Sequence, residues 1–133
     1  MKIEHIGIAV KNLDASKKIF ETLLNTPCYK VENVESEMVS TAFFKTGDTK
    51  VELLETTNPE GAVGKFIAAR GEGIHHIAYE VADINAEVKR LKEAGFIFTR
   101  EAPFHGADNK MVIFLHPKST NGILIELCQE IKD

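Results

Sequence analysis

Four side chains able to ligate a metal recur at matching places in two similar parts of this chain. Residues 5–10 read HIGIAV and residues 76–81 read HIAYEV, a shift of 71 residues; farther along, VEL at 51–53 aligns with IEL at 125–127. The repeat therefore places a histidine and a glutamate in each copy: His5, Glu52, His76 and Glu126. Imidazole nitrogens and carboxylate oxygens together suit a divalent transition metal with open coordination positions.

The flanking residues indicate which way these side chains point. Alternate residues of a strand face opposite sides, so His5 shares its face with the small Gly7 and Ala9, while Ile6 and Ile8 face the other way. Glu52 and Glu126 each stand between two apolar residues of opposite parity, and Ile77, Tyr79 and Val81 face away from His76. A single His or Glu on a strand is more often an ordinary hydrogen-bonded or solvated residue. Recurrence of all four in an internal repeat favours metal binding over that interpretation.

Three further histidines compete for the same role. His75 is adjacent to His76, but the alignment of the repeat selects His76 and turns His75 toward the other face of its strand. His105 falls in an expected loop and His116 ends an expected strand just before a proline. We expect both to be ordinary surface residues.

The first copy reads as one strand, one helix and three strands. We expect strands at 3–10, 28–34, 39–45 and 50–55, with a helix over 14–24. Asn12 and Asp14 offer N-capping side chains for the helix, and Pro27 follows its end. The expected module is therefore βαβββ.

The second copy repeats this plan after a linker at 57–61 and a short amphipathic helix at 62–70. We expect strands at 73–81, 96–100, 111–116 and 123–128, a helix from the Asp83 cap to about residue 94, and a loop at 102–110. A repeat near 70 residues is too long for a solenoid and fits twice, which indicates a duplicated module. The predicted fold is α+β, with two tandem βαβββ modules forming one domain over 1–133: module one at about 1–56, linker and short helix at 57–72, module two at 73–130. Two small sheets of this kind are expected to cover one another and to line a shared cleft.

Composition excludes several classes of protein. The net charge is −4 and there is no basic block, so a nucleic-acid partner is not expected. No apolar run approaches the roughly 20 residues of a membrane span, and the first residues show no signal-peptide pattern. Cys28 and Cys128 form no CxxC pair. We therefore expect a cytoplasmic protein with free thiols, no membrane association and a small-molecule substrate.

Five stretches of this sequence resemble the vicinal oxygen chelate superfamily and, within it, the methylmalonyl-CoA epimerases. They are His5–Val10, Gly47–Glu55, Gly71–Ala78, Phe114–Ser119 and Gly122–Leu127. The resemblance implies a homodimer and a divalent metal ion (cobalt, manganese, nickel or zinc) on the four candidate ligands. It also implies a CoA thioester substrate, with interconversion of (R)- and (S)-methylmalonyl-CoA through alpha-proton abstraction and a metal-stabilised enolate.

Such a reaction requires groups that carry the proton on both faces of the substrate carbon. The repeat suggests Glu52 and Glu126 for this catalytic role. Some epimerases that this chain resembles have a non-ligand Glu, regarded as a proton-transfer base, at the position of Thr41. Thr41 is therefore also a candidate substrate contact. Glu35 and Glu37 are weaker candidate bases. For the CoA phosphates, the candidates are the cationic residues Lys65, Arg70 and Lys118, each of which also fits a plain surface role.

Two alternatives remain open. Glyoxalase I of the same superfamily uses a similar His/Glu set to isomerise a glutathione hemithioacetal, so the ligands alone do not choose between the two enzymes. The turn at 116–119 resembles the epimerases more closely. A metal-free binding protein of this fold is the second alternative, and the intact set of four candidate ligands argues against it.

Overall fold

The computed structural model describes residues 1–132, which divide into two compact units. The first in sequence, here called the His5 unit, comprises His5–His75. The second, the His76 unit, comprises Met1–Glu4 together with the residues from His76 onward. The strand β1 (Lys2–Ala9) contributes to both units, because its first three residues belong to the His76 unit.

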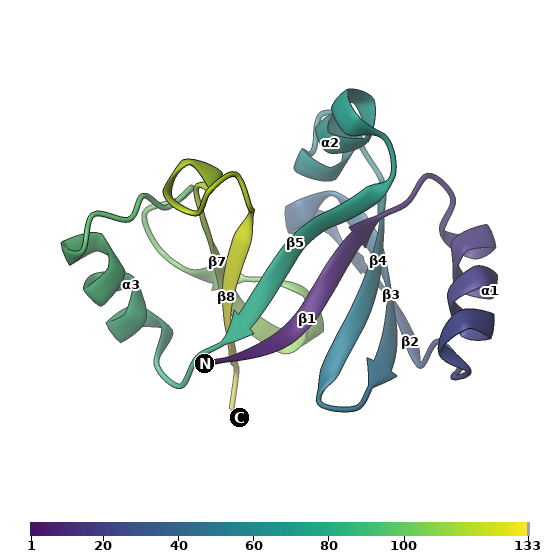
Figure 1. Cartoon of the computed structure of the whole chain (residues 1–133), viewed down its shortest axis with the longest axis horizontal. Coiled ribbons are helices and arrows are strands. Elements are labelled where there is room, and N and C mark those ends of the chain that lie inside the picture. The colour runs from purple at the N-terminus through teal and green to yellow at the C-terminus, as the bar shows by residue number, and fades with distance from the viewer. Residues whose placement is uncertain (133) are drawn as a thin grey trace. The chain divides into compact units, whose positions relative to one another are not determined.

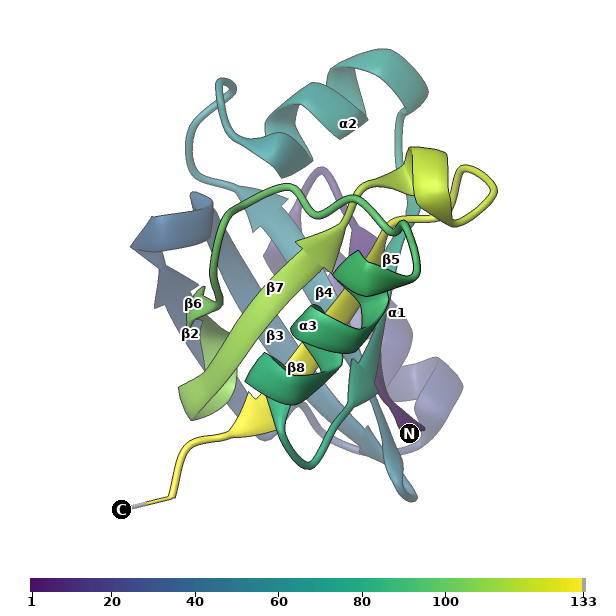
Figure 2. The same ribbon diagram turned by 90° about the vertical axis from the view of Figure 1, so that its left-hand side faces the viewer.

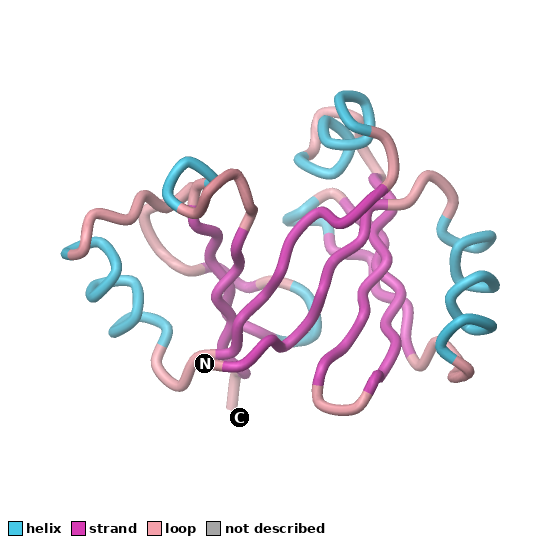
Figure 3. Tube along the Cα trace, in the orientation of Figure 1, coloured by secondary structure: helices cyan, strands magenta, loops and turns pink. Residues whose placement is uncertain are grey.

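The His5 unit consists of strands and helices that can be followed in Figures 1 and 3. In chain order these are the later part of β1, α1 (Leu13–Leu24), β2 (Lys30–Val34), β3 (Val39–Thr46), β4 (Thr49–Thr56) and α2 (Ala62–Arg70). The strands lie side by side in the order β2-β3-β4-β1, with β4 antiparallel to β3 and parallel to β1. The predicted βαβββ order of module one is confirmed, as is the helix over 62–70.

The His76 unit has the same strand order. Its elements are β5 (Gly73–Glu80), whose first three residues belong to the His5 unit, α3 (Ile84–Glu93), β6 (Phe104–His105), β7 (Lys110–Leu115) and β8 (Ile125–Glu130), arranged as β5-β8-β7-β6. Its strands β6, β7 and β8 are shorter than their counterparts β2, β3 and β4. Figure 2 shows α3 lying across this sheet, where it contacts β8. The α+β class predicted from sequence is therefore confirmed.

Both long helices begin at the residues that the sequence indicated. The Asn12 side chain accepts a hydrogen bond from the backbone N–H of Ala15 at 2.9 Å, and Asp83 accepts one from Ala86 at 3.1 Å. Each side chain satisfies a backbone donor that has no partner inside the helix. At the other end of α1, Asn25 takes the left-handed conformation (φ 52°) in which asparagine is tolerated. Among residues 1–132, no helix is long and apolar enough to cross a membrane.

Each sheet packs one face against its long helix. In the His5 unit this core contains buried Leu13 of α1 with Ala42, Phe44 and Leu53 of the sheet. In the His76 unit the core consists of Val81, Ile84, Val88, Leu91, Ile113, Leu115 and Leu127. Strand alternation turns the intervening residues to the opposite side of each sheet, here called the inner face. His5, Glu52, His76 and Glu126 all belong to inner faces.

One predicted strand is wrong. Residues 96–100 form a single bridge, Phe98 to Leu115, and the short strand β6 lies instead at Phe104–His105, inside the expected loop. Both contacts lie along the same edge of β7. Pro103 separates them; it has no backbone N–H to donate and it restricts the residue before it. The edge strand of this unit is therefore interrupted, whereas β2 of the His5 unit is continuous.

Candidate metal centre

The His5 unit brings one predicted histidine and one predicted glutamate into contact. β1 and β4 run parallel, and their register sets Gly7 opposite Glu52. This register leaves the carboxylate beside the imidazole of His5, two residues before Gly7, with Nδ1 of His5 3.1 Å from Oε2 of Glu52. Both residues are at least 95% buried. The pair is therefore held by backbone pairing and shielded from bulk water.

The His76 unit contains the equivalent pair. Here Ala78 lies opposite Glu126 in the parallel β5–β8 ladder, and Nε2 of His76 is 3.3 Å from Oε1 of Glu126. Both residues are again buried. The ring of Phe114 stands edge-on to the His76 imidazole, with centroids 5.6 Å apart. The two units therefore present the same donor types with the same strand register.

The spacing within each pair fits a divalent cation. Ligand atoms about 2.1 Å from an ion and at right angles to one another lie roughly 3.0 Å apart. The separations of 3.1 and 3.3 Å are close to this value. A hydrogen bond between imidazole and carboxylate also falls near this range, so the spacing is compatible with a metal and does not demand one. A neutral imidazole nitrogen beside a carboxylate oxygen suits cobalt, manganese, nickel or zinc.

Two phenylalanines lie in the same row as the glutamates. Phe43 of β3 pairs directly with Glu52, and Phe114 of β7 pairs with Glu126. Phe43 is fully buried, and the ammonium group of Lys30 lies 4.6 Å from its ring centre. These rings place apolar surface beside each carboxylate. Apolar rings lower the local dielectric constant, and they therefore strengthen the electrostatic interactions of the two carboxylates.

One row farther along the strands, the two inner faces differ. In the His5 unit this row holds Thr41 opposite Leu54. In the His76 unit it holds Val112 opposite Cys128, packed with Ala78 into a small apolar cluster. Burial raises the pKa of the Cys128 thiol far above its ordinary value, and the negative charges of Glu126 and Glu4 raise it further. Cys128 is therefore a protonated, unreactive side chain at neutral pH.

A buried charged group in the His76 unit was missed by the sequence reasoning. Nζ of Lys110 lies 3.3 Å from Asp108 and 3.9 Å from Glu4, and both Lys110 and Glu4 are buried. These residues are far apart in sequence and belong to no motif, so spacing gave no signal for their contact. The ammonium group offsets part of the negative charge of this inner face.

The remaining predicted residues lie in varied surroundings. Lys65 and Arg70 are exposed on α2, where the Arg70 guanidinium lies 5.7 Å from the Phe66 ring centre, and Lys118 is exposed in the 3₁₀ turn Pro117–Ser119. None of the three is held in a fixed binding geometry by a buried partner. Thr41, in contrast, has no exposed surface at all.

The competing histidines and glutamates have other neighbours. His75 stands edge-on to Phe66 at 5.1 Å. The exposed His105 contacts Asn109, and Nδ1 of the exposed His116 accepts a hydrogen bond from the backbone of Lys118. Glu35 and Glu37 form a 3₁₀ turn, with Glu35 exposed and Glu37 half-buried.

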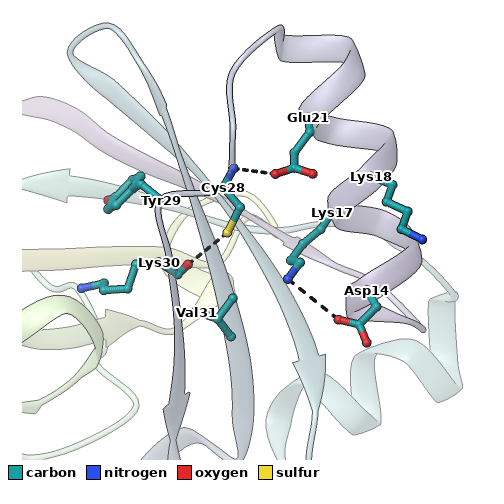
Figure 4. A pocket seen from close by; sticks show the side chains of 8 residues that line it. All are labelled: Asp14, Lys17, Lys18, Glu21, Cys28, Tyr29, Lys30 and Val31. Atoms are coloured by element: carbon teal, nitrogen blue, oxygen red, sulfur yellow. Dashed lines mark hydrogen bonds and ion pairs between the residues drawn. The ribbon is translucent and has the colours of Figure 1, made fainter.

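A separate hollow of about 540 Å³ lies between α1 and β2 (Figure 4). It is lined by Asp14, Lys17, Lys18, Glu21, Cys28, Tyr29, Lys30 and Val31. Several of its polar groups contact their neighbours: Lys17 lies 3.9 Å from Asp14, and Glu21 accepts a hydrogen bond from the backbone N–H of Cys28 at 2.9 Å. It includes none of the residues predicted to bind metal or substrate.

Comparison with known proteins gives relatives of nearly the same length. The chain is 37% identical over 130 residues to the ethylmalonyl-CoA/methylmalonyl-CoA epimerase of Cereibacter sphaeroides, covering 96% of this chain and 97% of that one. It is 33% identical over 128 residues to the uncharacterised protein YqjC of Bacillus subtilis, covering 96% and 91%.

A solved structure of an epimerase also matches the fold of this chain. A Streptomyces coelicolor methylmalonyl-CoA epimerase variant in complex with 2-nitronate-propionyl-CoA matches with a TM-score of 0.94 at 34% identity, covering 98% of this chain and 94% of that one. The model of the glyoxalase/bleomycin resistance protein/dioxygenase superfamily matches residues 4–114. The resemblance inferred from the sequence motifs is thereby confirmed: this chain belongs to the glyoxalase/bleomycin resistance protein/dioxygenase superfamily, the vicinal oxygen chelate proteins.

Proposed function

We propose that this chain is a divalent-metal-dependent epimerase that interconverts (R)- and (S)-methylmalonyl-CoA. The observation that carries the proposal is the pair of equivalent, buried His/Glu contacts, one in each unit. The relatives and the structural neighbour named as epimerases of this substrate support the choice of reaction. The family alone would leave the chemistry open, because one fold can host several reactions.

In this proposal His5, Glu52, His76 and Glu126 together hold one cation. Each pair supplies a nitrogen and an oxygen at a spacing that suits neighbouring positions of a coordination sphere. When bound, the ion supplies Lewis-acid stabilisation of the negative charge that develops on the thioester oxygen. An ion held by these four side chains would still have coordination positions open for the substrate.

The protein's part in the reaction is to move and retain a proton. Epimerisation removes the proton from C2 and returns one to the other face of the same carbon. Glu52 and Glu126 are the proposed proton carriers, because they occupy equivalent places in the two repeats. Each would exchange between the role of metal ligand and that of base. Phe43 and Phe114, which pair with them across the strands, exclude water from the carboxylates.

The CoA moiety would extend toward cationic side chains. Lys65, Arg70 and Lys118 remain the proposed partners for its phosphates, since all three are exposed and able to reorient. Their contribution is charge attraction that salt weakens. We also propose a cytoplasmic homodimer, which sedimentation of the purified protein and cell fractionation would test.

The decisive experiment measures both candidate reactions on one preparation. Protein reconstituted with cobalt or manganese is incubated in D₂O with methylmalonyl-CoA, and deuterium incorporation at C2 is followed by mass spectrometry. A parallel reaction measures the glutathione hemithioacetal of methylglyoxal. We expect one bound ion per chain and rapid exchange at C2, with little hemithioacetal turnover.

A matched control separates metal binding from general loss of an imidazole. The His76→Ala variant is expected to lose the ion and the exchange activity, whereas His105→Ala, which removes an exposed histidine, is expected to retain both. Faster turnover of the hemithioacetal than of methylmalonyl-CoA would assign glyoxalase chemistry instead. Failure of the wild-type protein to bind any divalent ion would favour a metal-free binding protein.

A further inference from the structure

The hydroxyl of Thr41 is a polar group without a partner. Among residues 1–132 its Oγ1 has no hydrogen-bond partner, and the residue has no exposed surface. Buried hydroxyls are normally hydrogen-bonded, because leaving one unpaired costs the free energy of removing it from water. An exception of this kind calls for a partner that is not part of the polypeptide.

The second copy of the module shows that the fold does not require this hydroxyl. Phe43 aligns with Phe114 in the repeat, so two residues earlier Thr41 aligns with Val112. Val112 is also buried on the inner face, where it packs with Ala78 and Cys128. Threonine and valine have nearly the same shape. Valine at this place serves packing fully, and the hydroxyl of Thr41 therefore needs a reason other than packing.

Thr41 lies close to the proposed reaction centre within its own unit. It pairs with Leu54 of β4, while the next inner-face residue of its strand, Phe43, pairs with Glu52. Thr41 and Glu52 are therefore diagonal neighbours on one face, a relation that separates residues by about 7–8 Å. That separation leaves room for one small oxygen-bearing group between the two side chains.

We infer that Thr41 is a substrate-binding residue whose hydroxyl donates a hydrogen bond to an oxygen of the acyl group. This inference rests on the proposed function, because it takes the acyl group of a CoA thioester as the group beside Glu52. The acceptor is either the thioester oxygen or the free carboxylate of the malonyl group. Bulk water does not meet this requirement, since the side chain is fully buried.

The test replaces Thr41 by its isosteric counterpart from the other repeat. Thr41→Val is compared with Thr41→Ser, which keeps the hydroxyl, and with Thr46→Val, which removes a hydroxyl from the same strand that donates to the backbone of Thr49. Exchange at C2 gives kcat and KM, and calorimetry gives Kd for methylmalonyl-CoA and for propionyl-CoA, which lacks the carboxylate. Urea unfolding of each variant is measured in parallel.

We expect Thr41→Val to lower kcat/KM by about 10- to 100-fold, the range for losing a hydrogen bond to a charged or polarised oxygen. Thr41→Ser should stay within a few-fold of the wild type, and Thr46→Val should leave the kinetics unchanged. Thr41→Val should unfold at the same or a higher urea concentration. Weaker binding of both thioesters identifies the thioester oxygen as acceptor, whereas weaker binding of methylmalonyl-CoA alone identifies the carboxylate.

Two outcomes would overturn the inference. Unchanged kinetics and affinities in a folded Thr41→Val protein would mean that the hydroxyl has no substrate partner, whatever happens to stability. Equal losses in Thr41→Val and Thr41→Ser would mean that side-chain shape, and not the hydroxyl, matters. An active wild type with either result contradicts this inference alone, whereas a wild type that neither binds nor exchanges methylmalonyl-CoA contradicts the proposed function together with it.

Discussion

The inner faces of the two units agree in one row and differ in the next. The agreeing row places an aromatic residue opposite a glutamate in both copies, Phe43 with Glu52 and Phe114 with Glu126. The following row holds Thr41 and Leu54 in one copy but Val112 and Cys128 in the other. The duplication has thus kept the row that carries the candidate ligands and has changed the row beside it.

This difference suggests that the two rows meet different requirements, one for metal binding and one for substrate recognition. The His/Glu pairs of the two units match in residue type, burial and strand register, although Nδ1 of the imidazole faces the carboxylate in one pair and Nε2 in the other. A substrate has no such twofold symmetry, so the surfaces that touch it need not match. The diverged row is therefore where an asymmetric acyl group would be recognised.

The largest effect is expected from removing either carboxylate. Glu52→Ala and Glu126→Ala should each lower deuterium incorporation at C2 by about 10²- to 10⁴-fold, because each is proposed to carry a proton and to hold the ion. The Glu87→Ala variant, which removes a half-buried glutamate paired with Arg90, should retain full exchange. Near-normal exchange in one of the two site variants would remove that residue from the catalytic role. The two glutamates would then differ in function despite their equivalent positions in the two units.

A reciprocal exchange in the diverged row should affect stability next. Val112→Thr introduces a hydroxyl into an apolar cluster and should lower the free energy of unfolding by about 1–3 kcal/mol, the cost of an unpaired buried hydroxyl. Thr41→Val should leave the free energy of unfolding unchanged or raise it. Urea denaturation with matched m-values measures both, and an equal loss in the two variants would show that their surroundings are alike.

Cys128 should make the stability of the folded chain depend on pH in the alkaline range. The folded chain raises the pKa of Cys128 above its ordinary value of 9.0, so the unfolded chain releases this proton first. Stability from this residue is therefore complete below about pH 9 and falls above it, by up to about 1.4 kcal/mol per pH unit. Unfolding measured from pH 8 to 10.5 should show a smaller slope for Cys128→Ala than for the wild type. Equal slopes in the two proteins would mean that Cys128 ionises as freely in the folded chain as in the unfolded one.

The smallest expected effects concern the helix caps. Asn12→Ala and Asp83→Ala should each cost about 1 kcal/mol, since each removes one hydrogen bond to a backbone donor in the first turn. Only the Asp83 contribution should shrink as salt rises, because Asp83 also interacts with the helix dipole as a charge. Thermal unfolding at two salt concentrations distinguishes the caps.

Local patterns predicted much of this fold and of its candidate site. The alternation around His5 and Glu52 correctly assigned their face, because strand geometry fixes it once the strand is known. The extent of β6 was not predictable, since an edge strand next to Pro103 can pair on either side of it and only the packing decides. The contact of Lys110 with Glu4 and the unpaired hydroxyl of Thr41 depend on distant residues, which no local pattern contains.

The composition of the His76 unit also bears on how this protein is made. Its two pieces, Met1–Glu4 and the part from His76 onward, are separated in the chain by the whole His5 unit. On the ribosome, Lys2 and Glu4 emerge long before their ion-pair partners Glu80 and Lys110. The His5 unit has all its residues early and can form during synthesis, but the His76 unit must wait until translation has passed its last strand. Pausing or truncation late in translation would therefore release a chain with one half folded and the charges of Lys2 and Glu4 still unmatched.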